Sequence, residues 1–265
     1  MRRSAQSTHD LFRLQGCGSA GGTHLAACED SMTLLMENAV DLSVQLAEDG
    51  SDQTILEMVD VLGIAHTAPD SWVLGDGVDI YDTGITNLVA AQGSLNDSLI
   101  AVVLVGMALG IDTQVVVGGY GGSSEFISAV LRQEVDLTSI SLQTALSRTD
   151  GNEAYVVLVV SDSPDSDAPD VPYLAGEGGV AQARAAGLSD EVMEQRRHFA
   201  ELAVALSGTI RGMYISNAVS EATRDCRREA MTESLLSDEL SQMMAELDRP
   251  LAPLTGDAAL PARRR

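Results

Sequence analysis

A strand, a glycine-rich turn and a helix follow one another in Gln114–Asp136, and this order constrains the fold more than any other segment. Three consecutive valines, Val115–Val117, predict a short buried strand. The turn Gly118–Gly122 follows, and Ser123 and Ser124 stand where a helix N-cap is expected, ahead of an amphipathic run. Such a helix start directs backbone N–H groups and the positive end of the helix dipole to one spot. The segment therefore predicts an anion-binding turn.

The same order occurs just upstream. Ile85–Ala91 predicts a strand, Gln92–Asp97 a turn with its helix cap, and Ser98–Leu109 an apolar helix that ends at Gly110. Two consecutive strand–turn–helix units are typical of an α/β lobe that binds a ligand at the carboxyl ends of its strands.

The order of these motifs resembles that of the solute-binding receptors of tripartite tricarboxylate transporters. The chain reads GS-x-N-D, apolar helix, G-Y-x-G-x-x-E, helix, E-V-D, where the family has a GPGS-type turn, a GYPG-type turn and an R-G-E-V-D segment. Further similar segments cover roughly residues 16–256, though the resemblance is patchy before residue 80. They are Gly18–Thr23, Asp167–Tyr173, Arg211–Ile215 and Pro250–Gly256.

The chain also departs from the family pattern. Gly121 stands at the usual proline, and Leu137 follows Asp136 where a glycine is usual. Nothing before residue 16 matches the first strand and first glycine-rich turn of the family, so we expect lobe one to be incomplete at its N-terminus. Arg2 and Arg3 with Leu25–Cys28 suggest a twin-arginine signal and lipobox, but the stretch between them is too polar for a signal peptide.

The resemblance implies an α/β, two-lobed periplasmic-binding-protein-like (type II) fold with a hinge. Lobe one would comprise residues 1–82 and 208–265, and lobe two residues 83–207. The ligand would be a small organic carboxylate held between the lobes and passed to the membrane components of the transporter. The location is extracytoplasmic for the family, and the receptor is expected to act as a monomer without a cofactor. The ligand-binding residues expected in this chain are Gly93, Ser94, Asn96 and Asp97 from the first turn, Tyr120, Gly121, Gly122, Ser123 and Ser124 from the second, and Gly21, Gly22 and Thr23 from lobe one.

Two alternatives remain open. The chain can be a remnant that folds but binds nothing, because the first ligand loop is missing. Taken one by one, each glycine can be a plain turn residue and each serine an ordinary helix cap. The chain can also be an α/β enzyme acting on an anionic substrate. Against this, the dispersed histidines and serines form no nucleophile motif or metal-ligand spacing, and the three cysteines form neither a disulfide framework nor a zinc site. Asp97 and Glu125 would repel an anionic ligand unless they bind backbone or water.

The charge gives an independent indication. The chain has 39 acidic residues against 16 basic ones, all arginine, and a formal net charge of −23. Self-repulsion on this scale destabilises a compact fold in dilute buffer, whereas molar salt shortens the Debye length to about 3 Å. The composition therefore predicts a halophilic source and argues against binding to nucleic acid or anionic membranes. No apolar stretch is long enough to span a membrane.

Overall fold

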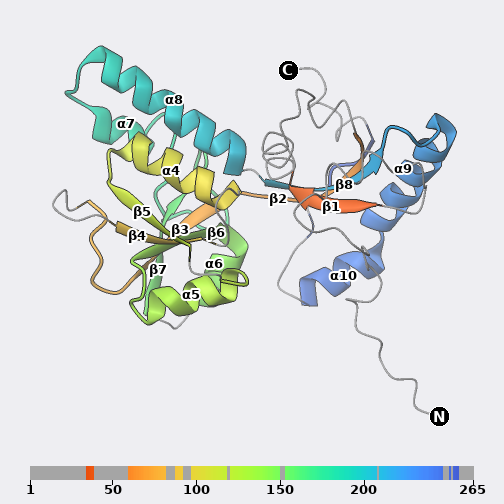
Figure 1. Cartoon of the computed structure of the whole chain (residues 1–265), viewed down its shortest axis with the longest axis horizontal. Helices are drawn as coiled ribbons and strands as arrows, with labels where there is room; N and C mark the ends of the chain where they lie inside the picture. The colour runs from red at the N-terminus through yellow and green to blue at the C-terminus, as the bar shows by residue number, and fades with distance from the viewer. Residues whose placement is uncertain are drawn as a thin grey trace, which may run out of the picture.

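The computed structural model describes residues 34–38, 59–81, 87–91, 97–117, 120–149, 153–207, 209–246, 251 and 253–256. Among them, a three-stranded and a five-stranded sheet organise two groups of elements (Figure 1). The smaller sheet has the order β1-β8-β2 and is antiparallel. Its strands are β1 (Leu35–Asn38), β2 (Val59–Ala68) and β8 (Thr209–Ser216).

The larger sheet has the order β5-β4-β6-β3-β7. Strand β4 pairs in parallel with both β5 and β6, whereas β3 pairs antiparallel with β6 and β7. The bounds are β3 (Asp70–Gly75), β4 (Asn87–Ala91), β5 (Thr113–Val117), β6 (Leu137–Ser141) and β7 (Ala154–Val159).

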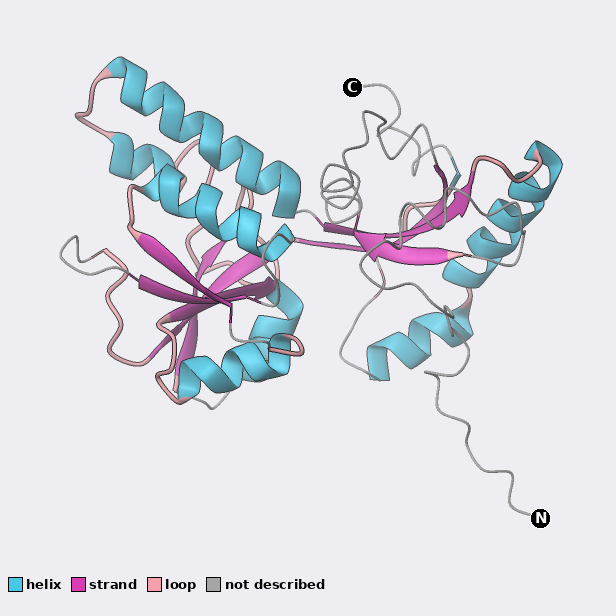
Figure 2. Ribbon diagram, viewed as in Figure 1, coloured by secondary structure: helices cyan, strands magenta, loops and turns pink. Residues whose placement is uncertain are grey.

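Helices cover both faces of the larger sheet (Figure 2). One face carries α4 (Asp97–Leu109), α7 (Val180–Ala185) and α8 (Asp190–Ser207) over a core that includes Trp72, Leu137 and Leu158. The other face carries α5 (Ser123–Leu131) and α6 (Leu142–Thr149), packed around Val73, Ile140 and Val130. Helix α4 is apolar nearly all round because α8 covers it from outside.

Arginines from two other helices satisfy the carboxyl end of α4, whose own last turn has no basic residue. The carbonyl oxygen of Leu109 accepts hydrogen bonds from Arg184 Nε at 2.8 Å and from Arg196 Nη1 at 3.5 Å. Arg184 also lies over the ring of Tyr81, 4.5 Å from its centroid. Cations at this end complement the helix dipole, so α7 and α8 are fixed to α4 by charge as well as by apolar packing.

The chain passes from the smaller to the larger sheet between Ala68 and Asp70, and returns between Ser207 and Thr209. Strand β3 precedes the lobe boundary expected at residue 83, yet it pairs within the larger sheet. The sequence pattern alone could not show this, because the partner of β3 is β6, more than sixty residues further along the chain.

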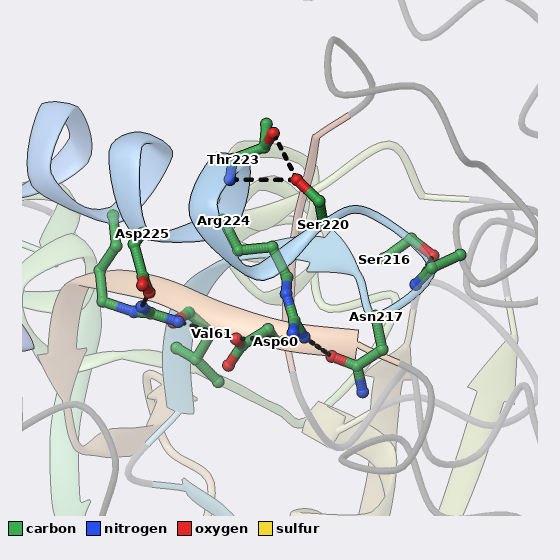
Figure 3. Close-up of polar contacts among 10 residues, drawn as sticks. Asp60, Val61, Ser216, Asn217, Ser220, Thr223, Arg224 and Asp225 are labelled. Carbon is green, nitrogen blue, oxygen red and sulfur yellow. Dashed lines mark hydrogen bonds and ion pairs between the residues drawn. The ribbon is translucent and has the colours of Figure 1, made fainter.

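Helices α9 (Glu221–Leu235) and α10 (Asp238–Glu246) belong to the smaller group. A buried ion pair fixes α9 to β2: Asp60 Oδ2 lies 2.7 Å from Arg228 Nη2 and 3.6 Å from Arg224 Nη1 (Figure 3). The exposed Asp225 also forms an ion pair with Arg228, with 2.6 Å between Asp225 Oδ1 and Arg228 Nη1. The Ser220 hydroxyl caps the helix by accepting from the Thr223 N–H, as its sequence position before an acidic first turn favours.

Hydrogen bonds at the amino ends of the parallel strands set their register. The backbone and side-chain amides of Asn87 both donate to the carbonyl oxygen of Asp112, just before β5. The Leu88 N–H donates to the Asp136 carboxylate at 2.7 Å, and the Asp136 N–H donates back to the Leu88 carbonyl. Asp136, the aspartate of the E-V-D segment, therefore connects β4 to β6 by hydrogen bonds.

Replacing Asp136 by alanine should lower the free energy of unfolding by about 1.5–3 kcal/mol, because a partly buried N–H loses a charged acceptor. Asp136→Asn keeps an oxygen acceptor and should cost less. The exposed Asp170→Ala variant serves as the control for loss of one negative charge. Denaturant unfolding in molar salt measures all three, and equal stability of Asp136→Ala and Asp170→Ala would contradict the assignment.

Among the described residues, none of the helices is long and apolar enough to span a membrane.

Candidate functional site

Three parallel strands end at one edge of the larger sheet. Ala91 pairs with Val117, so β4 and β5 end together, and β6, which pairs with β4 through Ala90 and Thr138, continues to Ser141 at the same edge. Helices α4 and α5 begin at this edge on opposite faces of the sheet (Figure 1). The chain goes from β4 outward to β5 and then back across β4 to β6, which makes β4 the point where the strand order reverses. Open α/β sheets bind their ligands at such a point.

The second predicted turn leads directly into α5. The N-cap is Gly122, with φ 149°, a backbone conformation that residues with a side chain rarely adopt. Ser123 and Ser124 are the first two residues of the helix, so the prediction that they stand at the N-cap is wrong by one residue. The reason is that glycine can also begin a helix, and Gly122 has no side chain with which to cap α5. The Glu125 and Phe126 amides donate to the Gly122 carbonyl, and among the described residues no side-chain hydrogen bond to the Ser123 or Ser124 amide is found.

Glu125 occupies part of this opening. Its Oε2 accepts a hydrogen bond from the Gly121 N–H at 2.7 Å, and both residues are exposed. Gly121 lies close to this carboxylate: a Cβ atom added at Gly121 would be 3.2 Å from Glu125 Oε1. A carboxylate in the first turn of a helix is favoured by the dipole, so Glu125 fills one of the positions that an anionic ligand would take.

Tyr120 anchors the turn to the core. Its ring meets Phe126 edge to face, with 5.8 Å between centroids and an interplanar angle of 78°. It is partly buried against the core cluster beneath α5. At the other end of α5, Arg132 Nε lies 2.7 Å from Glu134 Oε1, and this hydrogen bond lowers the pKa of the Glu134 carboxyl. The guanidinium thus pairs with an acid at the far end of the helix from the turn.

The remaining predicted residues fall largely outside the described part of the chain. Asp97 is the first residue of α4, but the structure does not describe its side chain. The structure does not describe Gly93, Ser94 and Asn96 of the first turn, nor Gly21, Gly22 and Thr23. Their proposed roles stay predictions.

Several polar residues reach the same edge without having been predicted. Asp70 pairs with Ser141, and Trp72 with Ser139, across β3 and β6. The Ser141 and Thr144 hydroxyls lie 2.9 Å apart at the start of α6, and the Leu142 N–H donates to the Pro69 carbonyl. The pairing of β3 with β6 brings Asp70 to Ser141 and Trp72 to Ser139, and no local sequence motif indicates that pairing.

The described residues contain no group of three or more histidine, cysteine or acidic side chains arranged to hold a metal ion. Cys226 is a free, exposed thiol on α9.

Comparison with known proteins identifies the fold. No protein-family model and no curated protein matches the sequence. Among solved structures, a TctC solute-binding protein from Polaromonas is similar with a TM-score of 0.61 and 13% identity, over 91% of this chain and 78% of that one. MatC from Rhodopseudomonas palustris with bound malate has a TM-score of 0.63 and 16% identity, over 93% and 77% of the two chains.

A third structure, an R. palustris protein with adipate, has a TM-score of 0.55 and 12% identity, over 78% of this chain and 63% of that one. At these identities the likeness establishes a shared fold. The α/β, periplasmic-binding-protein-like fold expected from the sequence is therefore confirmed.

Proposed function

We propose that the protein is a solute-binding receptor that captures a small organic carboxylate and delivers it to the membrane components of a tripartite tricarboxylate transporter. One observation carries the proposal: α5 begins after Gly122, a residue without a side chain, at the edge of the sheet where β4 and β5 end, in a fold shared with MatC and TctC. MatC holds malate and the third similar protein holds adipate, and both ligands are dicarboxylates. The site would act outside the cytoplasm, as a monomer and without a cofactor.

The start of α5 can bind a carboxylate in spite of the overall negative charge. Ser123 and Ser124 contribute hydroxyl and amide donors, and the helix dipole adds a partial positive charge at the same place. Residues Gly93, Ser94, Asn96 and Asp97 would supply the facing turn at α4, and Gly21, Gly22 and Thr23 the contacts from lobe one. The passages at Pro69 and between Ser207 and Thr209 would serve as the hinge.

An enzyme acting on an anionic substrate is the second candidate, and the site offers less for it. A nucleophilic serine needs a general base within hydrogen-bond reach. The one histidine side chain that the structure describes, His198, lies exposed on α8, a helix of the opposite face of the sheet from Ser123 and Ser124. Turnover of carboxylate esters or phosphates by the purified chain would favour the enzyme over the receptor.

Thermal unfolding in molar salt against a panel of small carboxylates tests the receptor. A ligand at a hundred times its dissociation constant adds about 2.7 kcal/mol to the stability of the folded state, which raises the midpoint by several degrees in a chain of this size. We expect malate or another dicarboxylate to do so, with an uncharged diamide of the same shape as the control. A folded chain that responds to no member of the panel would support the non-binding remnant instead.

Replacing Glu125 by glutamine should tighten binding of that carboxylate up to about fivefold, because one like charge leaves the position while an oxygen acceptor for the Gly121 N–H remains. Glu153→Gln is the matched control, since Glu153 is exposed and precedes β7 at the opposite edge of the sheet. Calorimetric titration compares the two. Unchanged affinity in Glu125→Gln would place the ligand away from the start of α5.

A halophilic origin would account for the net charge of −23 and for the absence of lysine from the sequence. The unfolding midpoint should rise steeply between about 0.1 M and molar potassium chloride, as the Debye length falls from about 10 Å to about 3 Å. Potassium chloride and sodium sulfate at equal ionic strength separate screening from ion-specific effects. Full stability at low salt would contradict the halophilic assignment.

A further inference from the structure

Two buried polar side chains face each other across β3 and β6. Trp72 and Ser139 are directly opposite in the antiparallel register, so their side chains lie on the same face of the sheet. Trp72 is fully buried and Ser139 is 2% exposed. The next pair on this face, Leu74 with Leu137, belongs to the apolar core beneath α4 and α8.

Neither polar group has a partner in the described part of the chain. Both Trp72 Nε1 and Ser139 Oγ are buried and form no hydrogen bond there. Ser71, which is next to Trp72 but on the opposite face of the sheet, does have a partner: its hydroxyl donates to the Ile140 carbonyl at 3.1 Å. An indole N–H and a hydroxyl left unpaired in an apolar core lower stability, and native structures satisfy nearly all such groups.

The chemistry of the pair defines what it can bind. The indole N–H only donates, and the serine hydroxyl donates and accepts. An oxygen atom within reach of both groups can accept a hydrogen bond from the indole N–H and from the hydroxyl. We infer that Trp72 Nε1 and Ser139 Oγ together bind a single hydrogen-bond-accepting oxygen, supplied either by an internal water molecule or by the polar end of the ligand.

The site lies two residues inside the edge where the chain passes between the sheets. The Asp70 carbonyl accepts from the Val160 N–H, and the Ser207 hydroxyl donates to the Val160 carbonyl at 2.8 Å. Both passages are therefore hydrogen-bonded to Val160, which belongs to the same core cluster as Trp72. A water molecule bound here would link β3 to β6 beside the proposed hinge. The alternative, a ligand oxygen, rests on the proposed function, because that oxygen would belong to a carboxylate entering at the edge of the sheet.

High-resolution crystal structures of the unmodified protein, without ligand and with malate, test the site directly. Oxygen density within hydrogen-bond distance of both atoms in the ligand-free crystals identifies water as the source. Density that is present only with malate, together with at least a tenfold loss of malate affinity in Ser139→Ala, identifies the ligand as the source. Absence of density in both crystals overturns the inference.

Fluorescence gives a second test that does not require crystals or ligand binding. Trp72 is the only tryptophan in the chain, so its emission reports on this site alone. We expect Ser139→Val, which removes the hydroxyl and fills the space, to shift the emission maximum, and the matched Ser71→Ala variant on the other face to leave it unchanged. Identical emission in Ser139→Val and the unmodified protein overturns the inference. A protein that binds no carboxylate yet shows this shift would retain the oxygen site while losing the proposed function.

Discussion

Two sets of hydrogen bonds at the amino end of β4 determine where the candidate site can form. Asn87 ties β4 to the start of β5 through Asp112, and Leu88 ties it to the start of β6 through Asp136. Parallel strands have no tight hairpin to fix their register, so contacts of this kind must fix it. With β4 and β5 in register from Asn87 and Thr113 to Ala91 and Val117, the helices that follow these two strands begin at one edge, beside the carboxyl end of β6. The site is thus a consequence of contacts at the opposite end of the sheet.

Charge acts differently at long and short range in this chain. The net charge of −23 opposes compaction everywhere, yet individual carboxylates are held by specific donors: Asp136 by a backbone amide, Asp60 by two arginines and Glu125 by the Gly121 amide. Salt screens the first effect strongly and the buried or partly buried contacts of Asp60 and Asp136 much less. At the proposed site, an anionic ligand would compete with Glu125 for the start of α5.

Sequence reasoning predicted the elements around the site better than its side chains. The order strand, turn, helix over residues 85–131 follows from local apolar runs and glycines, and β4, α4, β5 and α5 are found there. The structural role of the Asp136 carboxylate was not predictable, because its partner is a backbone N–H 48 residues away. Gln133 adopts φ 56°, a conformation for which glutamine gives no signal. The pairing of Trp72 with Ser139 likewise depends on β3 joining the larger sheet, which no motif indicates.

We propose that a small carboxylate binds at the start of α5, at the edge where the parallel strands β4, β5 and β6 end. The most direct measurement is a crystal structure of the protein grown with malate in molar salt. We predict a carboxylate group within hydrogen-bond distance of the Ser123 and Ser124 amides, with Glu125 displaced from Gly121 or bridged to the ligand by water. Malate bound at any other place, with the Glu125 contact intact, would contradict the account.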